Sequence, residues 1–377
     1  MQDSSRPKTR KPQWVMAAAI GILAAGGGYL IGNASKLVIS PELRGSLQAL
    51  SGWDLLALPL VIVGVLAVHE AGHLVGGMSR GMRFLMFIAG PLGWFRGANG
   101  IHFRWMWNLG TFGGLAAATP VPDQPLGPQL NRLVIGGPLA SLLLAAIGFA
   151  AMAWLPGRAG AYGMVVGVFS LLIFLVTAAP MRAGGFMSDG MQWLQLRRNP
   201  AMVDRRVRMM ALIGAGMAGT RPRDYDLQQL AQAQAITGDE PLYDIGVWLC
   251  SYFHALDRGE VDQAGQWLDR IETVYAEYPM GFRQTLAIEL ALFEALHRSR
   301  RPEAEAWLAQ SGGGIADAAR RHLAEAAVAA LRGEHASARG SLERAERSLG
   351  RSMDPGSAKV TVDQIAALRS TLRLQGA

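Results

Sequence analysis

The sequence predicts a mainly α-helical, polytopic membrane protein with about four transmembrane helices and a C-terminal soluble domain of α-helical repeats. Half of the 377 residues are hydrophobic and only 17% are charged, which is more apolar than an ordinary soluble domain. The charges are also unevenly distributed. Residues 1–200 contain 15 Lys and Arg against 6 Asp and Glu, whereas residues 201–377 contain 21 against 23. The chain therefore combines a basic, apolar region with a region of balanced charge.

Four apolar stretches have the length of about 20 residues that a helix needs to cross a bilayer. They are residues 14–33, 55–79, 133–157 and 159–181. A shorter run, 84–95, contains Gly90 and Pro91, so we expect a re-entrant or interfacial loop within the segment 84–118. The first stretch is either an uncleaved anchor or a signal peptide. Its uncharged core exceeds the 7–15 residues typical of signals, which favours the anchor.

The basic residues predict the orientation of these spans, because Lys and Arg are retained in cytoplasmic loops. Placing the basic tail, residues 1–13, inside also puts the arginine-rich segment 80–132 and everything after Arg182 inside. Both ends of the chain are then cytoplasmic, and the composition fits a bacterial inner membrane. The arginines lie between uncharged runs and form no continuous stripe, which argues against nucleic acid as a partner. A single cysteine, Cys250, excludes an internal disulfide.

One predicted span contains an ionisable cluster, in the sequence VHEAGHLVGG. His69 and His73 are four positions apart, so they share one face of a helix and can bind one Zn²⁺. Glu70 lies beside them, where a carboxylate can take a proton from an attacking water and pass it to a leaving amine. A purely structural trio is the alternative, but ionisable residues in hydrocarbon are costly and usually functional. Haem ligation is excluded, since histidines four apart on one helix cannot occupy opposite axial positions.

A catalytic zinc site needs a third protein ligand, because zinc keeps three such ligands and one open position. Outside this cluster, residues 1–200 contain one other histidine, His102, and five acids: Asp3, Glu42, Asp54, Asp123 and Asp189. Asp189 follows the last predicted span at its cytoplasmic end, at a depth similar to that of His69 and His73. His102 is the rival ligand. Its neighbours in NGIHFRW are basic and aromatic, a composition that favours an interfacial role.

Three motifs together resemble the site-2 proteases, a family of intramembrane zinc metalloproteases. They are HEAGH at 69–73, GGPLASLLLA at 136–145, and the element from Pro180 to Asp189 and Gly190. The resemblance covers about residues 54–195. It implies a transmembrane metalloprotease domain, 14–196, in which His69, His73 and Asp189 hold one Zn²⁺ per chain and Glu70 is the general base. The implied activity is hydrolysis of peptide bonds in or next to transmembrane segments of substrate proteins, in regulated intramembrane proteolysis.

The sequence also departs from this family. Thr177 stands three residues before Pro180, where the family usually has Asn; the resemblance implies that this element positions substrate. The spacing from Pro180 to Asp189 is longer than the commonest form, and Ser141 stands where Asn is frequent. In relatives, the segment corresponding to 84–118 often contributes strands near the cleft, so we hypothesise that it binds an unwound substrate by strand addition.

The sequence leaves two alternative functions for the membrane region. The first is a catalytically inactive membrane scaffold whose helical repeats bind a partner protein, which the departure at Thr177 supports. Against it stands a complete set of candidate ligands with a general base. The second is a transporter, but residues 1–200 contain no internal repeat of broken helices.

Residues 200–377 contain three stretches that can be laid over one another: ALDRGEVDQAGQWL from Ala255, ALHRSRRPEAEAWL from Ala295 and ALRGEHASARGSL from Ala330. Small residues recur where two helices must approach, at Ala264, Ala304 and Ala338, and are followed by Trp267, Trp307 and Leu342. This pattern predicts helix-pair repeats resembling tetratricopeptide arrays. Such arrays offer a concave face to a peptide or partner protein. A plain helical bundle is the alternative.

Overall fold

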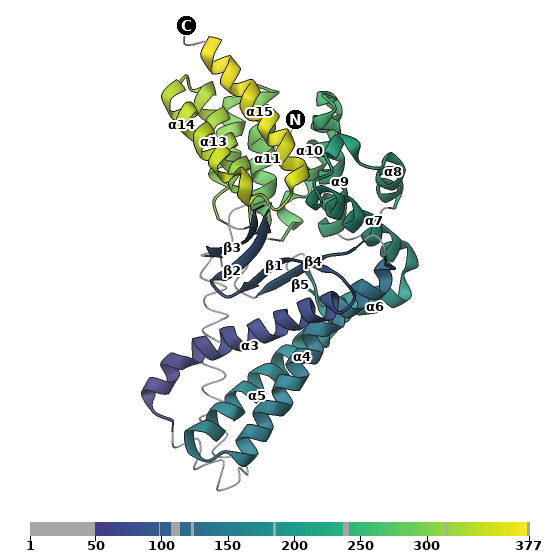
Figure 1. Ribbon diagram of the computed structural model, residues 1–377, viewed down its shortest axis with the longest axis vertical. Helices are drawn as coiled ribbons and strands as arrows, with labels where there is room; N and C mark the ends of the chain where they lie inside the picture. The colour runs from purple at the N-terminus through teal and green to yellow at the C-terminus, as the bar shows by residue number, and fades with distance from the viewer. Residues whose placement is uncertain are drawn as a thin grey trace, which may run out of the picture. The chain divides into compact units, whose positions relative to one another are not determined.

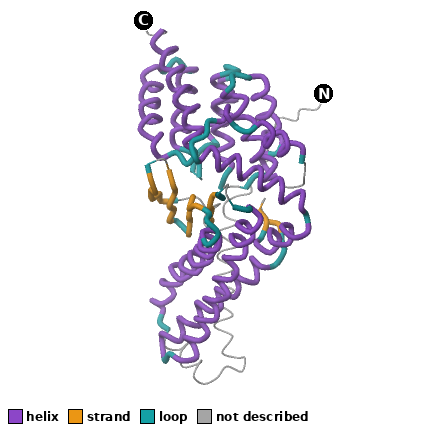
Figure 2. Tube along the Cα trace, turned by 45° about the vertical axis from the view of Figure 1, so that its right-hand side comes forward, coloured by secondary structure: helices purple, strands orange, loops and turns teal. Residues whose placement is uncertain are grey.

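The computed structural model describes residues 50–374, apart from residues 98, 107–113, 122–123, 184–185, 237–240, 280 and 314. The described chain is mainly helical, with one small four-stranded sheet (Figures 1 and 2). It divides into two compact units. One contains the described residues up to Leu58 together with Ile147–Val165, and the other contains Pro59–Ala146 and Val166 onward.

Three helices of the described chain are long and apolar enough to cross a membrane: α3 (Gly52–Met78), α4 (Leu126–Trp154) and α5 (Gly157–Ala178). Large apolar side chains on them remain exposed to the surroundings, among them Leu60, Leu143 and Leu175. A lipid environment satisfies such surfaces, whereas water does not. The helices begin two to seven residues earlier than the apolar runs 55–79, 133–157 and 159–181 and end one to three residues earlier. The basic tail and the predicted first span lie outside the described residues.

In the smaller unit, the start of α3 is joined to α5 by polar side chains. The Tyr162 hydroxyl donates to Asp54 Oδ1 at 2.8 Å, and Arg158 Nη2 donates to Asp54 Oδ2 at 3.2 Å. Asp54 also accepts from the backbone N–H of Ser51, which caps the first turn of α3. An acid, a phenol and an arginine suit the polar boundary of a membrane helix.

The segment after α3 forms strands where a loop was expected. The strands are β1 (Arg83–Ala89), β2 (Leu92–Gly97), β3 (Gly100–Trp105) and β4 (Leu115–Thr119), all antiparallel, in the order β3-β2-β1-β4. Gly90 and Pro91, the residues that suggested a loop, form the tight β1–β2 turn, in which Gly90 has φ +57°. The expected interfacial position of this segment stays a prediction.

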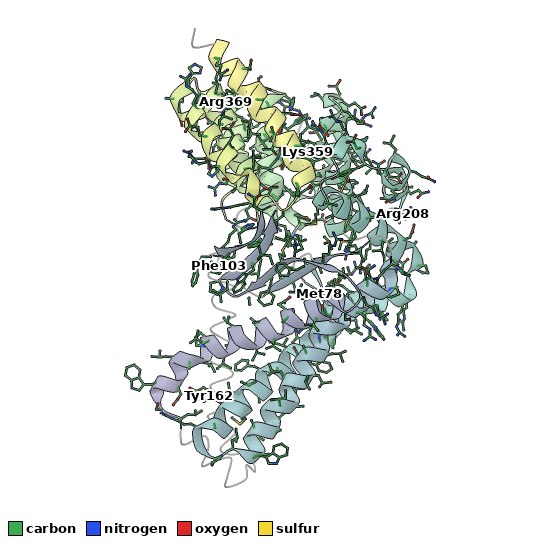
Figure 3. All side chains as sticks on the ribbon, in the orientation of Figure 1. Met78, Phe103, Tyr162, Arg208, Lys359 and Arg369 are labelled. Atoms are coloured by element: carbon green, nitrogen blue, oxygen red, sulfur yellow. The ribbon has the colours of Figure 1, made fainter. Side chains whose placement is uncertain are left out.

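The two faces of the sheet have different neighbours. On one face, Phe84, Phe87 and Ala118 pack with Leu74 of α3 and Leu133 of α4. On the other face, buried residues of the strands pack with residues of the C-terminal helical region: Met86, Ile88 and Phe95 with Phe282, Ile315 and Met353. The sheet is thus a layer between membrane-type helices and the C-terminal helices. At its β3 edge Ile101, Phe103 and Trp105 are exposed. Figure 3 labels Phe103 on this edge.

After α5 comes a short β5–β6 hairpin (Arg182–Ala183, Phe186–Met187), and the rest of the described chain is helical. Its α-helices are α6 (Asp189–Arg198), α7 (Pro200–Met217), α8 (Leu227–Ala235), α9 (Pro241–Asp257), α10 (Val261–Thr273), α11 (Arg283–Leu296), α12 (Arg301–Ala309), α13 (Ala318–Leu331), α14 (His335–Ser348) and α15 (Pro355–Leu374). Short 3₁₀ turns lie at Pro222–Asp224 (η2), Tyr275–Glu277 (η3) and Leu349–Arg351 (η4).

The three aligned stretches of the C-terminal region each cover a turn between two packed helices: α9 with α10, α11 with α12, and α13 with α14. The small residues Ala264, Ala304 and Ala338 are fully buried at the start of each second helix. A larger side chain there would hold the paired helices apart. The aligned stretches therefore mark the places where paired helices approach each other. The tetratricopeptide-like repeat itself stays a prediction.

A buried polar network joins four of these helices. Arg320 of α13 forms an ion pair with Glu289 of α11 and donates to Gln364 of α15 at 2.8 Å. The hydroxyl of Tyr252 in α9 donates to the same Glu289 at 3.2 Å. The charges are buried yet paired and hydrogen-bonded, the condition under which a protein interior tolerates them.

Candidate metal centre

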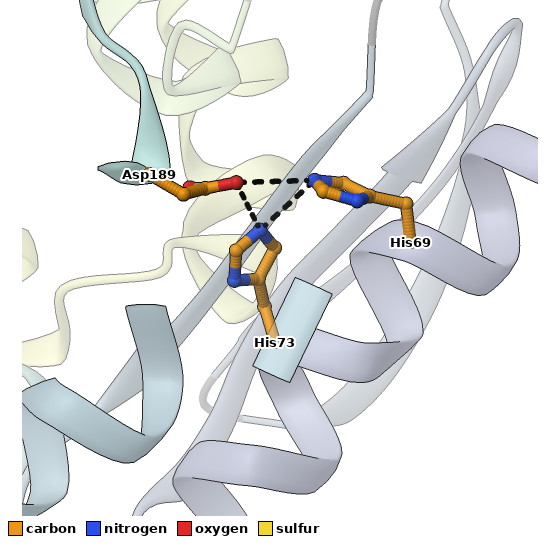
Figure 4. Close-up of side chains that lie close together, drawn as sticks. All are labelled: His69, His73 and Asp189. Atoms are coloured by element: carbon orange, nitrogen blue, oxygen red, sulfur yellow. Dashed lines mark hydrogen bonds and ion pairs between the residues drawn. The ribbon is translucent and has the colours of Figure 1, made fainter. Parts of the chain in front are cut away.

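Two histidines of α3 and the first residue of α6 converge at one point (Figure 4). Asp189 Oδ2 lies 3.3 Å from His69 Nε2 and 3.4 Å from His73 Nε2, and the two Nε2 atoms are 3.2 Å apart. Both histidines are buried, and Asp189 is nearly so. In the described part of the chain, these three residues form the group able to hold a metal ion. His102 is not among them.

The separations fit a tetrahedral metal site. Ligand atoms bound at 2.0–2.1 Å with tetrahedral angles lie about 3.3–3.4 Å from one another, as a consequence of that geometry. The three observed separations, 3.2–3.4 Å, agree with this value. Two imidazoles and one carboxylate also match the donor set of catalytic zinc sites with three protein ligands.

The other ring nitrogen of each histidine has a partner that orients the ring. The Nδ1–H of His73 donates to the Leu133 carbonyl at 2.7 Å, because a carbonyl can only accept; in the neutral ring, Nε2 then carries the lone pair. His69 Nδ1 lies 2.9 Å from the Ser141 hydroxyl. Leu133 and Ser141 both belong to α4. The second helix therefore fixes which nitrogen of His73 faces Asp189 and where the His69 ring points.

Glycines let α3 and α4 approach closely enough for these bonds. A Cβ atom at Gly72 would collide with the Gly136 carbonyl, and one at Gly76 would collide with the Arg132 carbonyl. A Cβ at Gly137 would overlap the His73 imidazole itself. The motif GGP at 136–138 thus has a physical reason: its first glycine admits the backbone of α3 and its second admits the His73 ring.

Asp189 is positioned by its own helix start. Ser188 is the N-cap of α6; its hydroxyl accepts from Met191 N and donates to the Ala179 carbonyl at 2.5 Å. Gly190 packs against the Ala178 carbonyl, where a Cβ would collide. The Asp-Gly pair therefore lets α6 begin directly against the end of α5.

The electrostatics of Asp189 favour an ionised carboxylate. Burial raises its pKa, but hydrogen bonds to His69 and His73 and their charge interactions outweigh burial and hold the pKa below its ordinary value. The carboxylate therefore carries the negative charge that a divalent cation needs.

Glu70 is the fourth ionisable residue of the site, and it meets the sheet. Its side chain is buried, and its carboxylate accepts a hydrogen bond from the backbone N–H of Ala116 in β4. A Cβ on Gly114 would lie 2.7 Å from Glu70 Oε1, so this glycine, with φ +91°, leaves the space that the carboxylate occupies. Strand β4 is thus held beside Glu70.

The chain was compared with known proteins. No family model, curated protein or solved structure matches it.

The structure brings together the four principal residues of the sequence prediction: His69, His73 and Asp189 at one point, and Glu70 on the same helix. It places the others elsewhere. The Thr177 hydroxyl donates to Phe174 O within its own helix, at 3.5 Å, and Pro180 lies in the turn that leads to β5. His102 stacks on Phe95 of the sheet. No signal in the sequence points to Ser141, Leu133 or Gly114, because a sequence does not tell which distant backbone or hydroxyl group meets His69, Glu70 or His73.

Ser141→Ala removes the hydroxyl that orients His69. We expect metal affinity to fall by about 10- to 100-fold, the usual effect of losing an outer-shell partner of a ligating histidine. Competition for Zn²⁺ against a chelator, in detergent, measures the change. Ser170→Ala is the matched control, since Ser170 is a buried serine of α5 whose hydroxyl has no hydrogen-bond partner among the described residues. Equal affinities for the two variants would contradict the orienting role.

Proposed function

We propose that this protein is an intramembrane zinc metalloendopeptidase, similar to the site-2 proteases, that hydrolyses peptide bonds in or next to transmembrane segments of other proteins. The observation that carries the proposal is the tetrahedral spacing of His69, His73 and Asp189 with a buried glutamate beside them. The proposed cofactor is one Zn²⁺ per chain. When bound, Zn²⁺ supplies a Lewis acid that lowers the pKa of water and polarises a peptide carbonyl.

In this proposal Glu70 moves the proton. Its carboxylate takes a proton from the water whose oxygen adds to the scissile carbonyl carbon, and then delivers that proton to the amine nitrogen as the C–N bond breaks. The N–H of Ala116 holds the carboxylate in place during both transfers. Buried surroundings suit this role, because they exclude competing water from the acid.

Glu70→Gln keeps the shape of the side chain and removes its basicity. We expect metal content to be unchanged and cleavage to fall by about 10²- to 10⁴-fold, the usual contribution of general acid–base catalysis. Cells that express the variant should accumulate uncleaved membrane proteins, which a comparison of membrane proteomes will detect. Glu303→Gln on an exposed surface of α12 is the matched control. Wild-type cleavage by Glu70→Gln would defeat the mechanism.

A strand edge beside Glu70, unpaired among the described strands, supports a mode of substrate binding. Strand β4 pairs with β1 on one side, and the Ala116 N–H points to its other side, toward Glu70. A helical substrate shields its peptide bonds; a segment unwound onto this edge exposes them next to Glu70. Small and helix-breaking residues are therefore expected in substrates.

Ala116→Pro removes the backbone donor of this edge that faces Glu70 while leaving the β1 side of the strand unchanged. We expect cleavage to fall at least about tenfold, because the Glu70 carboxylate loses a buried hydrogen bond. Ala116→Val is the matched control, because it adds similar bulk and keeps the N–H. Metal content reports folding of both. Undiminished cleavage by the proline variant would refute a role of the β4 edge beside Glu70.

The proposal includes a membrane topology and a partner site. Four spans, with the N-terminus and residues 200–377 cytoplasmic, satisfy the distribution of arginines and agree with a bacterial inner membrane. The orientation can be tested by fusing to the C-terminus a fluorescent protein that fluoresces only in the cytoplasm; we expect the fusion to fluoresce. The helix pairs of residues 200–377, if they stack as tetratricopeptide-like repeats, offer a surface for a peptide or partner protein.

Thr177 favours one alternative function, an inactive membrane scaffold whose helical repeats bind a partner. The residue lacks the amide of the family's asparagine, and its hydroxyl is used inside its own helix. An inactive scaffold has no need of a metal, so metal content separates the two proposals.

A further inference from the structure

A pocket of about 200 Å³ lies where the sheet meets the C-terminal helices, apart from the metal centre. One wall is the β2–β3 turn and the start of β3, and the other is the end of α14 with η4. The lining residues are Asn99, Gly100, Ile101, His102, Arg347, Gly350 and Arg351. The proposed protease function assigns no role to any of them.

The two walls are held together by backbone contacts. The Asn99 N–H donates to the Gly350 carbonyl at 3.2 Å. A Cβ on Gly350 would collide with the Asn99 amide, and one on Gly97 would lie 3.2 Å from the backbone of Arg351. The absence of side chains at both glycines therefore permits the contact. The pocket is preformed, and a ligand in it would touch both the sheet and the helices.

The charge of the pocket is positive. Arg347 and Arg351 both line it. Among the described residues, the acid that forms an ion pair with either arginine is Glu343, 4.0 Å from Arg347, and both of these side chains are mostly exposed. Arg351 has no ion-pair partner in the described part of the chain. Two further groups, Arg104 and Asp317, lie close enough to act on His102.

Helix stability accounts for only one of these arginines. Arg347 is in the last turn of α14, where a cation offsets the partial negative charge of the helix end. Arg351 instead lies near a second arginine, Arg104, and near His102. Burial lowers the pKa of His102 and of Arg104, and repulsion from Arg351 lowers both further, although Asp317 acts in the opposite direction. Such repulsion is relieved when an anion binds.

We propose that this pocket binds a phosphate group between Arg347 and Arg351. Guanidinium groups present planar donor pairs that match phosphate oxygens, and two of them balance the charge of about −1.5 to −2 that a phosphate monoester carries at pH 7. His102 supplies a further hydrogen-bonding group. The open space above Gly100, where an added Cβ would meet nothing within 4 Å, leaves room for the molecule that bears the phosphate.

The test uses the full chain in detergent and follows its thermal unfolding midpoint. Inorganic phosphate is titrated against sodium chloride of matched ionic strength, and short-chain phosphatidic acid is titrated against short-chain phosphatidylcholine. A ligand that joins the sheet to the helices raises the midpoint. Arg351→Gln and Arg347→Gln should each raise the ligand concentration needed for a given midpoint shift by about tenfold, as expected for the loss of a charge-assisted hydrogen bond. Arg339→Gln, an exposed arginine on the same helix α14, is the matched control and should not.

A response to inorganic phosphate that the pocket variants lose and the control keeps supports the site and identifies a soluble phosphate compound as its ligand class. A response to phosphatidic acid alone, with the same dependence on the arginines, supports the site and identifies a lipid headgroup. No response to either probe, or an equal loss in Arg339→Gln, overturns the proposal. Circular dichroism of the ligand-free variants confirms that they are folded.

Discussion

The close approach of α3 and α4 is the constraint on which the candidate metal centre depends. Gly72 and Gly76 on one helix and Gly136 and Gly137 on the other remove the side chains that would keep the backbones apart. Only at this separation can Leu133 O accept from His73 and Ser141 lie within hydrogen-bonding distance of His69. Two rings on one helix are thereby fixed by groups of a second helix. A ligand set assembled in this way is rigid before a metal arrives, which reduces the cost of ordering it on binding.

The sheet extends this arrangement in two directions. Its β4 strand holds Glu70 through the Ala116 N–H, while Gly114 leaves space for the carboxylate. Its opposite face packs against Phe282 and Met353 of the C-terminal helical region. The helices after residue 200 are therefore in physical contact with the sheet that borders Glu70.

The residues that lie together in the candidate site could be predicted from the sequence because each carries a local signal. His69, Glu70 and His73 share one motif at helical spacing, and the Asp189-Gly190 pair has a glycine that the structure explains by contact with Ala178 O. The apolar runs likewise marked three helices with small errors at their ends, because a helix end is set by caps and turns and not by apolar content alone.

The features that could not be predicted from the sequence depend on contacts between residues far apart in the chain. The run 84–95 is apolar on both faces, so alternation did not identify its strands; each face is covered, one by Leu74 and the other by Ile315. The partnership of Ser141 with His69 joins residues 72 positions apart. His102, the rival ligand, stacks on Phe95 of the sheet and is not part of the group of His69, His73 and Asp189.

The most direct test of the account is the zinc content of the purified chain. Elemental analysis compares four folded proteins in detergent: wild type, His73→Ala, Asp189→Ala and the control His102→Ala. Wild type and His102→Ala should contain about one zinc per chain, as expected for a single site with three protein ligands. The content should fall in His73→Ala and Asp189→Ala. A folded wild type that takes up no zinc even when zinc is added, or uptake that survives both substitutions, would contradict the central claim.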